Sequence, residues 1–98
     1  MNVVFLPSTR SELLWMRAYY TSVFPAGAKR ASEHFRLTCS VIRENPLMGH
    51  PVQDMQGVRE FAIQRTPFSV IYRVIDNRIE VLRIWDQRGD RSRLLQVS

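Results

Sequence analysis

The sequence contains few of the residues that form disulfide frameworks and metal clusters. Cys39 is the only cysteine among 98 residues, which excludes a disulfide framework, and its helical apolar surroundings predict a small buried side chain. The only histidines, His34 and His50, stand apart, and no HExxH, P-loop or GxSxG motif is present. We therefore expect no metal and no cofactor, and we expect the histidines to have structural or solvent-exposed roles.

Long apolar runs are also missing. No run approaches the ~18 residues of a membrane-spanning helix, and the first residues lack the basic start and apolar stretch of a signal peptide. Together with the single cysteine, this predicts a cytoplasmic protein with no membrane partner. The length predicts one small domain over residues 1–98 and excludes two-domain enzymes, and 45% hydrophobic with 23% charged residues is typical of a folded chain.

Lysine is almost absent, although the chain is strongly basic. Lys29 is the only lysine among 14 basic residues, which stand against 9 acidic residues and give a formal net charge of +5. Arginine presents a planar fork of donors that suits carboxylates and phosphates. The excess of arginine indicates either a GC-rich genome or a surface that binds nucleic acid or an acidic protein.

The order of the predicted elements defines an α+β fold. An apolar run closed by proline predicts an N-terminal strand, helical spacing predicts two helices, and period-two alternation after a loop predicts three more strands. The expected elements are, in order, a strand at 3–6, a helix at 9–23, a second helix that has Pro25 in its first turn and stops at Asn45-Pro46, a loop at 45–57, and strands at 58–65, 68–75 and 79–85. We expect an N-terminal strand and an antiparallel helical hairpin packed on a mainly antiparallel sheet.

Pairing parity assigns the strand side chains to two faces. A two-residue turn at Thr66-Pro67 places Ile63 opposite Val70. A three-residue turn at 76–78 then decides which side chains of the last strand lie on each face. The face under the helices is expected to carry Phe61, Ile63, Phe68, Val70, Tyr72, Val74, Leu82 and Ile84. The opposite, open face is expected to carry Ser69, Ile71, Arg73, Val81, Arg83 and Trp85. This second face is either a half-solvated sheet surface or, because arginine and tryptophan are enriched at binding hot spots, the seat of a partner segment.

Basic residues are densest directly after the last strand. Arg88, Arg91 and Arg93 lie within six residues, which indicates contact with phosphates or an acidic partner, or a solvated tail balanced by Asp86 and Asp90. Cleavage of RNA without a metal needs a base, an acid and cations. The cations are present, but neither aspartate stands in a pattern typical of a catalytic base.

Four short motifs follow one another in the second half of the chain. They are Asn45-Pro46-x-x-Gly49, Val58-Arg59-Glu60-Phe61, Pro67-Phe68-x-Val70-Ile71-Tyr72-Arg73-Val74 and Ile79-Glu80-Val81-Leu82-Arg83-Ile84. In this order the sequence resembles the RelE/ParE toxin superfamily over nearly its whole length. The resemblance implies the toxin of a type II toxin–antitoxin pair, which a cognate acidic antitoxin wraps and neutralises.

Members of this superfamily act in two ways. RelE-like members cut messenger RNA in the ribosomal A site without a metal, whereas ParE-like members inhibit DNA gyrase. The RelE-type catalytic arginine corresponds to Ser69 here, the tyrosine near the C-terminus to about Leu95, and the histidine after the last strand to a position near Asp86. Because these residue types are missing while Arg88 and Arg91 remain, the resemblance favours the ParE-like subgroup.

The resemblance is compatible with three functions, of which one is favoured. The favoured function is a non-enzymatic inhibitor that engages gyrase through the helical hairpin and through Arg88, Arg91 and Arg93. The alternative is a ribosome-dependent endonuclease that holds RNA phosphates with Arg73, Arg83, Arg88 and Arg91. A third possibility is a domain that has lost toxicity and persists as a binding module.

The antitoxin is expected to cover the helical hairpin and the open sheet face. On the sheet, its expected contacts are Arg73, Val81, Arg83 and Trp85.

Overall fold

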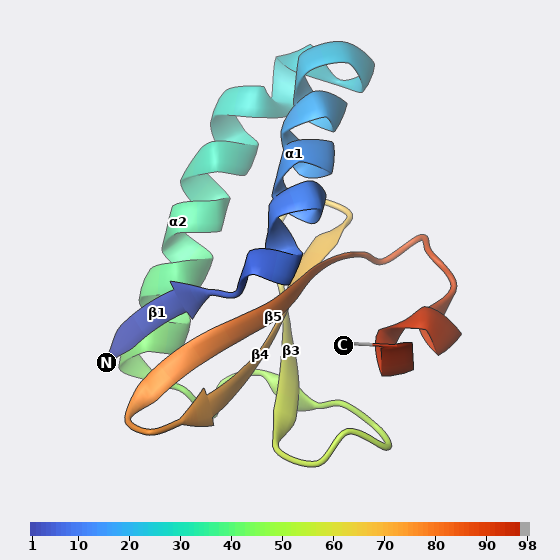
Figure 1. The fold of residues 1–98 in the computed structure, drawn as a ribbon. Coiled ribbons are helices and arrows are strands. Elements are labelled where there is room, and N and C mark those ends of the chain that lie inside the picture. The colour runs from blue at the N-terminus through green and yellow to red at the C-terminus, as the bar shows by residue number, and fades with distance from the viewer. Residues whose placement is uncertain (97–98) are drawn as a thin grey trace.

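A helical hairpin and a five-stranded sheet form two layers (Figure 1). The computed structural model describes residues 1–96, with side chains to residue 94. The elements are β1 (Asn2–Phe5), α1 (Arg10–Ala18), α2 (Ala28–Glu44), β2 (His50–Pro51), β3 (Val58–Ala62), β4 (Phe68–Ile75) and β5 (Arg78–Asp86), with short helical turns at Pro7–Thr9, Tyr19–Val23, Pro25–Gly27 and Arg91–Gln96. The predicted α+β fold is confirmed.

The sheet has the strand order β1-β5-β4-β3-β2. β1 runs parallel to β5, and the other neighbours are antiparallel, so the first strand lies beside the last. β2 falls inside the segment predicted as a loop, because two residues are too few to give a periodic pattern. None of the helices in residues 1–96 is long and apolar enough to cross a membrane.

The register between β3 and β4 differs from the predicted register by two residues. Phe61 pairs with Val70, where Ile63 was expected, because the connection is longer than two residues and Arg65 takes a left-handed φ of 63°. A shift of two keeps every side chain on its predicted face. Phe61, Ile63 and Val70 therefore still belong to the core under the helices.

The turn between β4 and β5 corrects two of the predicted face assignments. It has two residues, Asp76 and Asn77, with φ values of 49° and 61°, which is the geometry of a tight hairpin turn. Val81 consequently pairs with Tyr72 and faces the helices, fully buried, although it was predicted on the open face. Leu82 faces the opposite side, although it was predicted under the helices.

A β-bulge then restores the predicted arrangement. The register changes between Ile71, which pairs with Arg83, and Tyr72, so Leu82 has no opposite residue. Beyond the bulge Ile84 returns to the face under the helices, as predicted.

Each face of the sheet has its own apolar cluster. Under the helices, the fully buried Phe68, Tyr72 and Ile79 pack with Ile42 of α2 and Tyr20. On the other face, a smaller cluster holds Val58, Ile71, Leu82, Trp85 and Leu94. Leu94 comes from the Arg91–Gln96 turn, so the C-terminal segment folds back over the part of the face that was predicted to be open (Figure 1).

Candidate functional site

Four arginines were expected to hold RNA phosphates, namely Arg73, Arg83, Arg88 and Arg91, which we call the sheet arginines. The structure places each of them beside a carboxylate of its own chain. This pairing decides what chemistry the four cations can perform.

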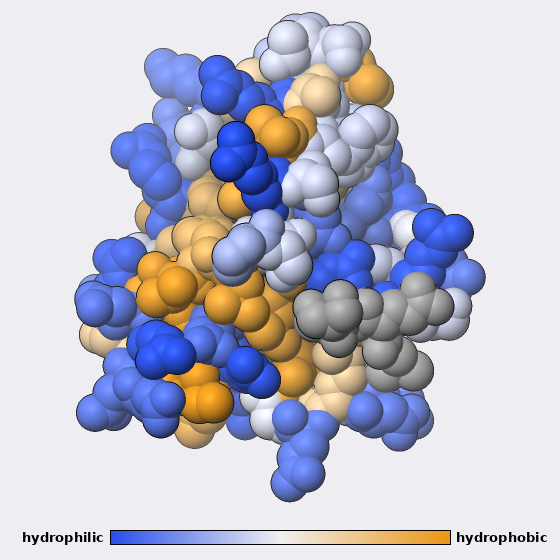
Figure 2. Space-filling model, in the orientation of Figure 1, coloured by the Kyte–Doolittle hydropathy of each residue, from blue (hydrophilic) through white to orange (hydrophobic). Residues whose placement is uncertain are grey.

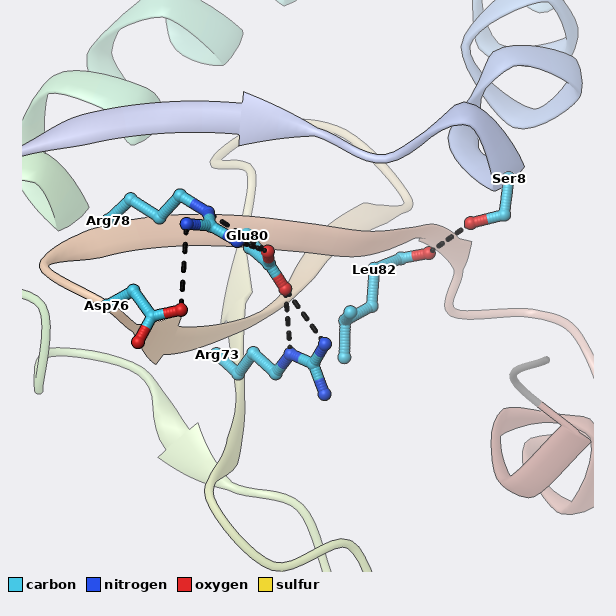
Figure 3. Close-up of polar contacts among 6 residues, drawn as sticks. All are labelled: Ser8, Arg73, Asp76, Arg78, Glu80 and Leu82. Atoms are coloured by element: carbon cyan, nitrogen blue, oxygen red, sulfur yellow. Dashed lines mark hydrogen bonds and ion pairs between the residues drawn. The ribbon is translucent and has the colours of Figure 1, made fainter.

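Arg73 and a second arginine, Arg78, share the carboxylate of Glu80 (Figure 3). Arg73 Nε donates to Glu80 Oε1 at 2.9 Å, and Arg78 NH2 donates to Oε2 at 2.6 Å. The Glu80 side chain is only 7% exposed, whereas the two arginine side chains are 43% and 40% exposed. Hydrogen bonds from Arg78 and Arg73 hold the pKa of Glu80 below its usual value. The carboxylate therefore stays ionised and fixes both guanidinium groups on the open face.

Arg83 belongs to an ion pair that ties α1 to the sheet. Its Nε donates to Glu12 Oε2 at 2.6 Å, and the other oxygen of Glu12 accepts the backbone N–H of Ile84 at 2.9 Å. Near the same edge, the Ser8 hydroxyl lies 3.5 Å from the carbonyl oxygen of Leu82. Side chains from the Pro7–Thr9 turn and the start of α1 thus cover the edge of β5 beyond the end of β1, which would otherwise offer unpaired groups to another strand.

Arg91 and the buried Ser69 converge on Glu60. Arg91 NH2 lies 2.7 Å from Glu60 Oε1, and the Ser69 hydroxyl donates to Oε2 at 2.5 Å. Burial alone would raise the pKa of Glu60, but the hydrogen bonds from Arg91 and Ser69 outweigh it and lower that pKa. Ser69 is fully buried, so the position of the RelE-type catalytic arginine offers no side chain to solvent.

Arg88 is held by Asp86 and by an aromatic ring. Its Nε and NH2 donate to the two oxygens of Asp86 at 2.8 and 2.7 Å, and its guanidinium lies 4.8 Å from the centroid of the Tyr19 ring. The hydrogen bonds from Arg88 lower the pKa of Asp86. Asp86, near the position of the histidine of nuclease members, is therefore a weakly basic ion-pair partner.

Of the residues expected to bind the antitoxin, Arg73 remains half-exposed on the open face. Val81 is buried under the helices, Arg83 is paired with Glu12, and Trp85 is 5% exposed beneath the C-terminal segment. Trp85 lies on the predicted face but is covered there, because the chain after β5 folds back, which the sequence does not indicate. Arg93, a predicted phosphate contact, lies exposed in that segment, and the side chain of Leu95 lies outside what the structure describes.

A groove that the sequence did not reveal runs between α1 and α2. It has a volume of about 380 Å³ and is lined by Met16, Arg17, Tyr20, Thr21, Ala28, Ala31, Ser32 and Phe35. The groove exists because Ala28, Ala31 and Ser32 of α2 are small, and aromatic rings form its floor. Alanine and serine at this helical spacing could have signalled the groove, but its existence depends on how the two helices pack.

The remaining candidate residues do not form a catalytic cluster. His34 lies on α2 and His50 on β2, and Cys39 on α2 is partly buried, where full burial was expected. Burial raises the pKa of the Cys39 thiol. Across residues 1–96 no three histidine, cysteine or acidic side chains lie close enough together to hold a metal ion.

Comparisons with known proteins match this arrangement. The family model described as the ParE toxin of the type II toxin–antitoxin system parDE matches residues 3–91. A solved structure described as the chromosomal ParDE toxin–antitoxin system from P. aeruginosa is 25% identical, with a TM-score of 0.68 over 86% of this chain and 92% of that chain. No curated protein matches the chain.

The fold and the family match together define a type II toxin. Within that class, the chain belongs to the ParE toxin family. The predicted resemblance to the RelE/ParE superfamily is confirmed, and so is the predicted ParE-like subgroup.

Proposed function

We propose that this toxin inhibits DNA gyrase and does not cut messenger RNA. The observation that carries the proposal is the pairing of the sheet arginines with carboxylates of their own chain. An arginine that stabilises the charge of a cleaved phosphodiester must reach the phosphate, and separating it from a bidentate carboxylate costs free energy. A ribonuclease that used these arginines would have to break several of the pairs on binding RNA.

The carboxylates that pair with Arg91 and Arg88 are equally unsuited to act as a general base. A base works best when its pKa lies near the working pH. The pKa values of Glu60 and Asp86 are instead lowered by Arg91 and Arg88. Toxicity without nuclease chemistry is consistent with the family to which the chain belongs, and gyrase is the target that the resemblance implies.

We further propose that an acidic antitoxin neutralises the toxin by seating an amphipathic segment in the groove between α1 and α2. The floor of the groove is apolar, with Met16, Tyr20 and Phe35, and Arg17 stands at its wall. The segment extends over the open sheet face to the half-exposed Arg73. Figure 2 shows a band of apolar surface over β1 and β5, flanked by hydrophilic side chains, that such a segment would cross. A gyrase inhibitor of this kind would act in the cytoplasm.

Two assays with the purified toxin test the proposal. The expected result is that the toxin blocks supercoiling of relaxed plasmid by gyrase and leaves ribosome-bound message intact. Cleavage of ribosome-bound message that is lost in Arg88→Ala and Arg91→Ala would contradict it, since the sheet arginines would then be catalytic. The antitoxin is tested by co-expression with the neighbouring small reading frame, where a complex is expected and the absence of one would contradict an antitoxin from that frame.

A further inference from the structure

The tip of the helical hairpin exposes two consecutive large apolar side chains. α1 ends in a π-helical turn, Tyr19–Val23, closed by a hydrogen bond from the Phe24 N–H to the Tyr19 carbonyl at 2.9 Å. This turn leaves Val23 64% exposed and Phe24 50% exposed. π-helical turns are rare in proteins, and those that occur are often found at functional sites.

The Phe24 ring is held in place although it is half-exposed. Its ring atom Cε2 lies 2.5 Å from the point where a Cβ on Gly27 would stand, so the ring occupies the space left by the missing side chain. Its centroid also lies 6.3 Å from that of the Tyr20 ring. An aromatic side chain that is already ordered loses little entropy on binding, which favours it as an interface anchor.

Three cations line a hollow together with this ring. Lys29 and Arg30 lie in the first turn of α2, and Arg65 comes from the turn between β3 and β4. Together with Phe24 they line a hollow of about 480 Å³, in which Glu33 is the only acidic residue among those that the structure describes. No ion pair joins Lys29, Arg30 or Arg65 to a carboxylate within the described residues, in contrast to the sheet arginines.

Two of these cations stand where they weaken the fold. The N-terminus of a helix carries partial positive charge, so cations in its first turn are unfavourable. The first turn of α2 holds no acidic residue, and Gly27 provides no side-chain cap. Arg65 also takes a left-handed φ of 63°, which favours glycine. Local preferences that fail together at one place indicate a functional surface.

We propose that Val23, Phe24, Lys29, Arg30 and Arg65 form the target-binding surface of the toxin, the tip surface, and that it docks on an acidic protein surface with an apolar centre. The inference rests on the proposed function, since gyrase is the protein that would carry the complementary surface. Exposed valine and phenylalanine favour a protein over nucleic acid, because phosphate contacts leave such side chains in water. The cations at the rim would pair with acidic residues of the partner, and the Phe24 ring would bury itself in the apolar centre of the partner surface.

The location of the tip surface also explains how a segment in the groove would neutralise the toxin. Tyr20 lines the groove and packs against Phe24, and Ala28 in the groove directly follows Gly27 beneath the Phe24 ring. An antitoxin segment in the groove would therefore end beside the tip surface and obstruct a target bound there. In Figure 1 the tip lies at the top of the hairpin, far from the turn between β4 and β5.

The test compares two double charge reversals on the same helix. Lys29→Glu/Arg30→Glu changes the tip surface, and Arg36→Glu/Arg43→Glu makes the same charge change at exposed positions further along α2. A third variant, Phe24→Ser, removes the aromatic anchor. Each is measured for growth arrest on induction, inhibition of purified gyrase, binding of the antitoxin from the neighbouring frame, and thermal unfolding.

We expect the tip reversal and Phe24→Ser each to raise the concentration that half-inhibits gyrase by at least about tenfold and to weaken growth arrest. The control reversal should change it by less than about twofold. Because acidic residues suit the first turn of α2, the tip reversal should unfold at no lower temperature than the unaltered toxin, so its loss of activity is not a folding defect.

The outcomes separate this inference from the proposed function. Tip variants that still arrest growth and inhibit gyrase overturn the inference and leave gyrase as the target. If the unaltered toxin spares gyrase but arrests growth, and the tip variants do not, the target is wrong and the tip surface stands. The inference is overturned if the tip reversal weakens antitoxin binding as much as it weakens gyrase inhibition. It is also overturned if the unaltered toxin binds DNA alone and the tip reversal abolishes that binding. A toxin that neither arrests growth nor inhibits gyrase overturns both.

Discussion

The hydroxyl of Tyr72 accepts a hydrogen bond from the backbone N–H of Gly49 at 2.9 Å. The same hydroxyl donates to the carbonyl of Pro46 at 2.7 Å. Two motifs that carry the family resemblance, the Asn-Pro-x-x-Gly loop and the tyrosine-arginine strand, are therefore parts of one structural tether. Arg59 strengthens it, because its NH1 donates to the Gly49 carbonyl at 2.8 Å.

Tyr72→Phe should destabilise the toxin without abolishing its activity. The substitution removes both hydrogen bonds and leaves the Gly49 N–H and the Pro46 carbonyl without a partner, at a cost of about 1–3 kcal/mol. Urea unfolding measures the change. Tyr20→Phe is the matched control, since the Tyr20 hydroxyl makes no hydrogen bond within the described residues, and it should unfold like the unaltered chain. Equal stability of both variants would contradict the tether.

Gly49→Ala tests the same loop from its other side. A Cβ there would stand 2.8 Å from the Tyr72 hydroxyl and 2.9 Å from the Glu60 carbonyl oxygen, so the loop must move, at a cost of about 1–3 kcal/mol or more. Gly57→Ala is the control, because a Cβ at Gly57 meets nothing within 4 Å and only its φ of 76° is unfavourable, at about 1 kcal/mol. A larger loss of unfolding free energy in Gly57→Ala would contradict the close approach.

The faces of the sheet show what pairing parity can and cannot predict. The β3–β4 register was wrong by two residues and every face was still right, because a shift of two preserves parity. Val81 and Leu82 were placed wrongly, since Asp76 and Asn77 make a two-residue turn through left-handed conformations. Ile84 was placed correctly only because the bulge at Leu82 compensates for that turn.

The candidate site was less predictable than the fold, because its contacts join distant residues. The sequence identified Arg83 but not Glu12, which lies 71 residues earlier, and it identified Arg91 but not Glu60. The helical periodicity predicted both helices, although α1 ends at Ala18 and gives way to a π-helical turn that the pattern did not indicate. It gave no information on the spacing between them, which creates the groove and sets the hairpin tip.

The ion pair of Glu60 predicts an acid-sensitive contribution to stability. A carboxylate whose pKa is lower in the folded than in the unfolded state stabilises the fold above the unfolded value, near 4.5, and loses this effect as the pH falls through the folded pKa. Glu60→Gln should cost about 1 kcal/mol at pH 7, and the difference from the unaltered chain should shrink between about pH 5 and pH 3.

The control for this titration is Glu44→Gln. Glu44 is exposed at the end of α2 and makes no ion pair within the described residues, so this substitution should leave the unfolding free energy nearly unchanged at both pH values. A Glu60→Gln effect that grows on acidification would contradict the assignment of the pair.

Ser32→Arg should weaken antitoxin binding while leaving toxicity intact. Ser32 is exposed and lines the groove between α1 and α2, so a long side chain there would fill space that the antitoxin segment needs. Ser40→Arg makes the same change at an exposed position of α2 that does not line the groove. Binding of the neighbouring-frame protein should fall by at least about tenfold for Ser32→Arg only. Equal binding by both variants would place the antitoxin elsewhere.

The proposed target is tested by titrating purified toxin into a gyrase supercoiling reaction. We expect supercoiling of relaxed plasmid to stop as toxin is added and to recover when the antitoxin is supplied. Full supercoiling in excess toxin, with cleavage of message on ribosomes in a parallel reaction, would contradict it.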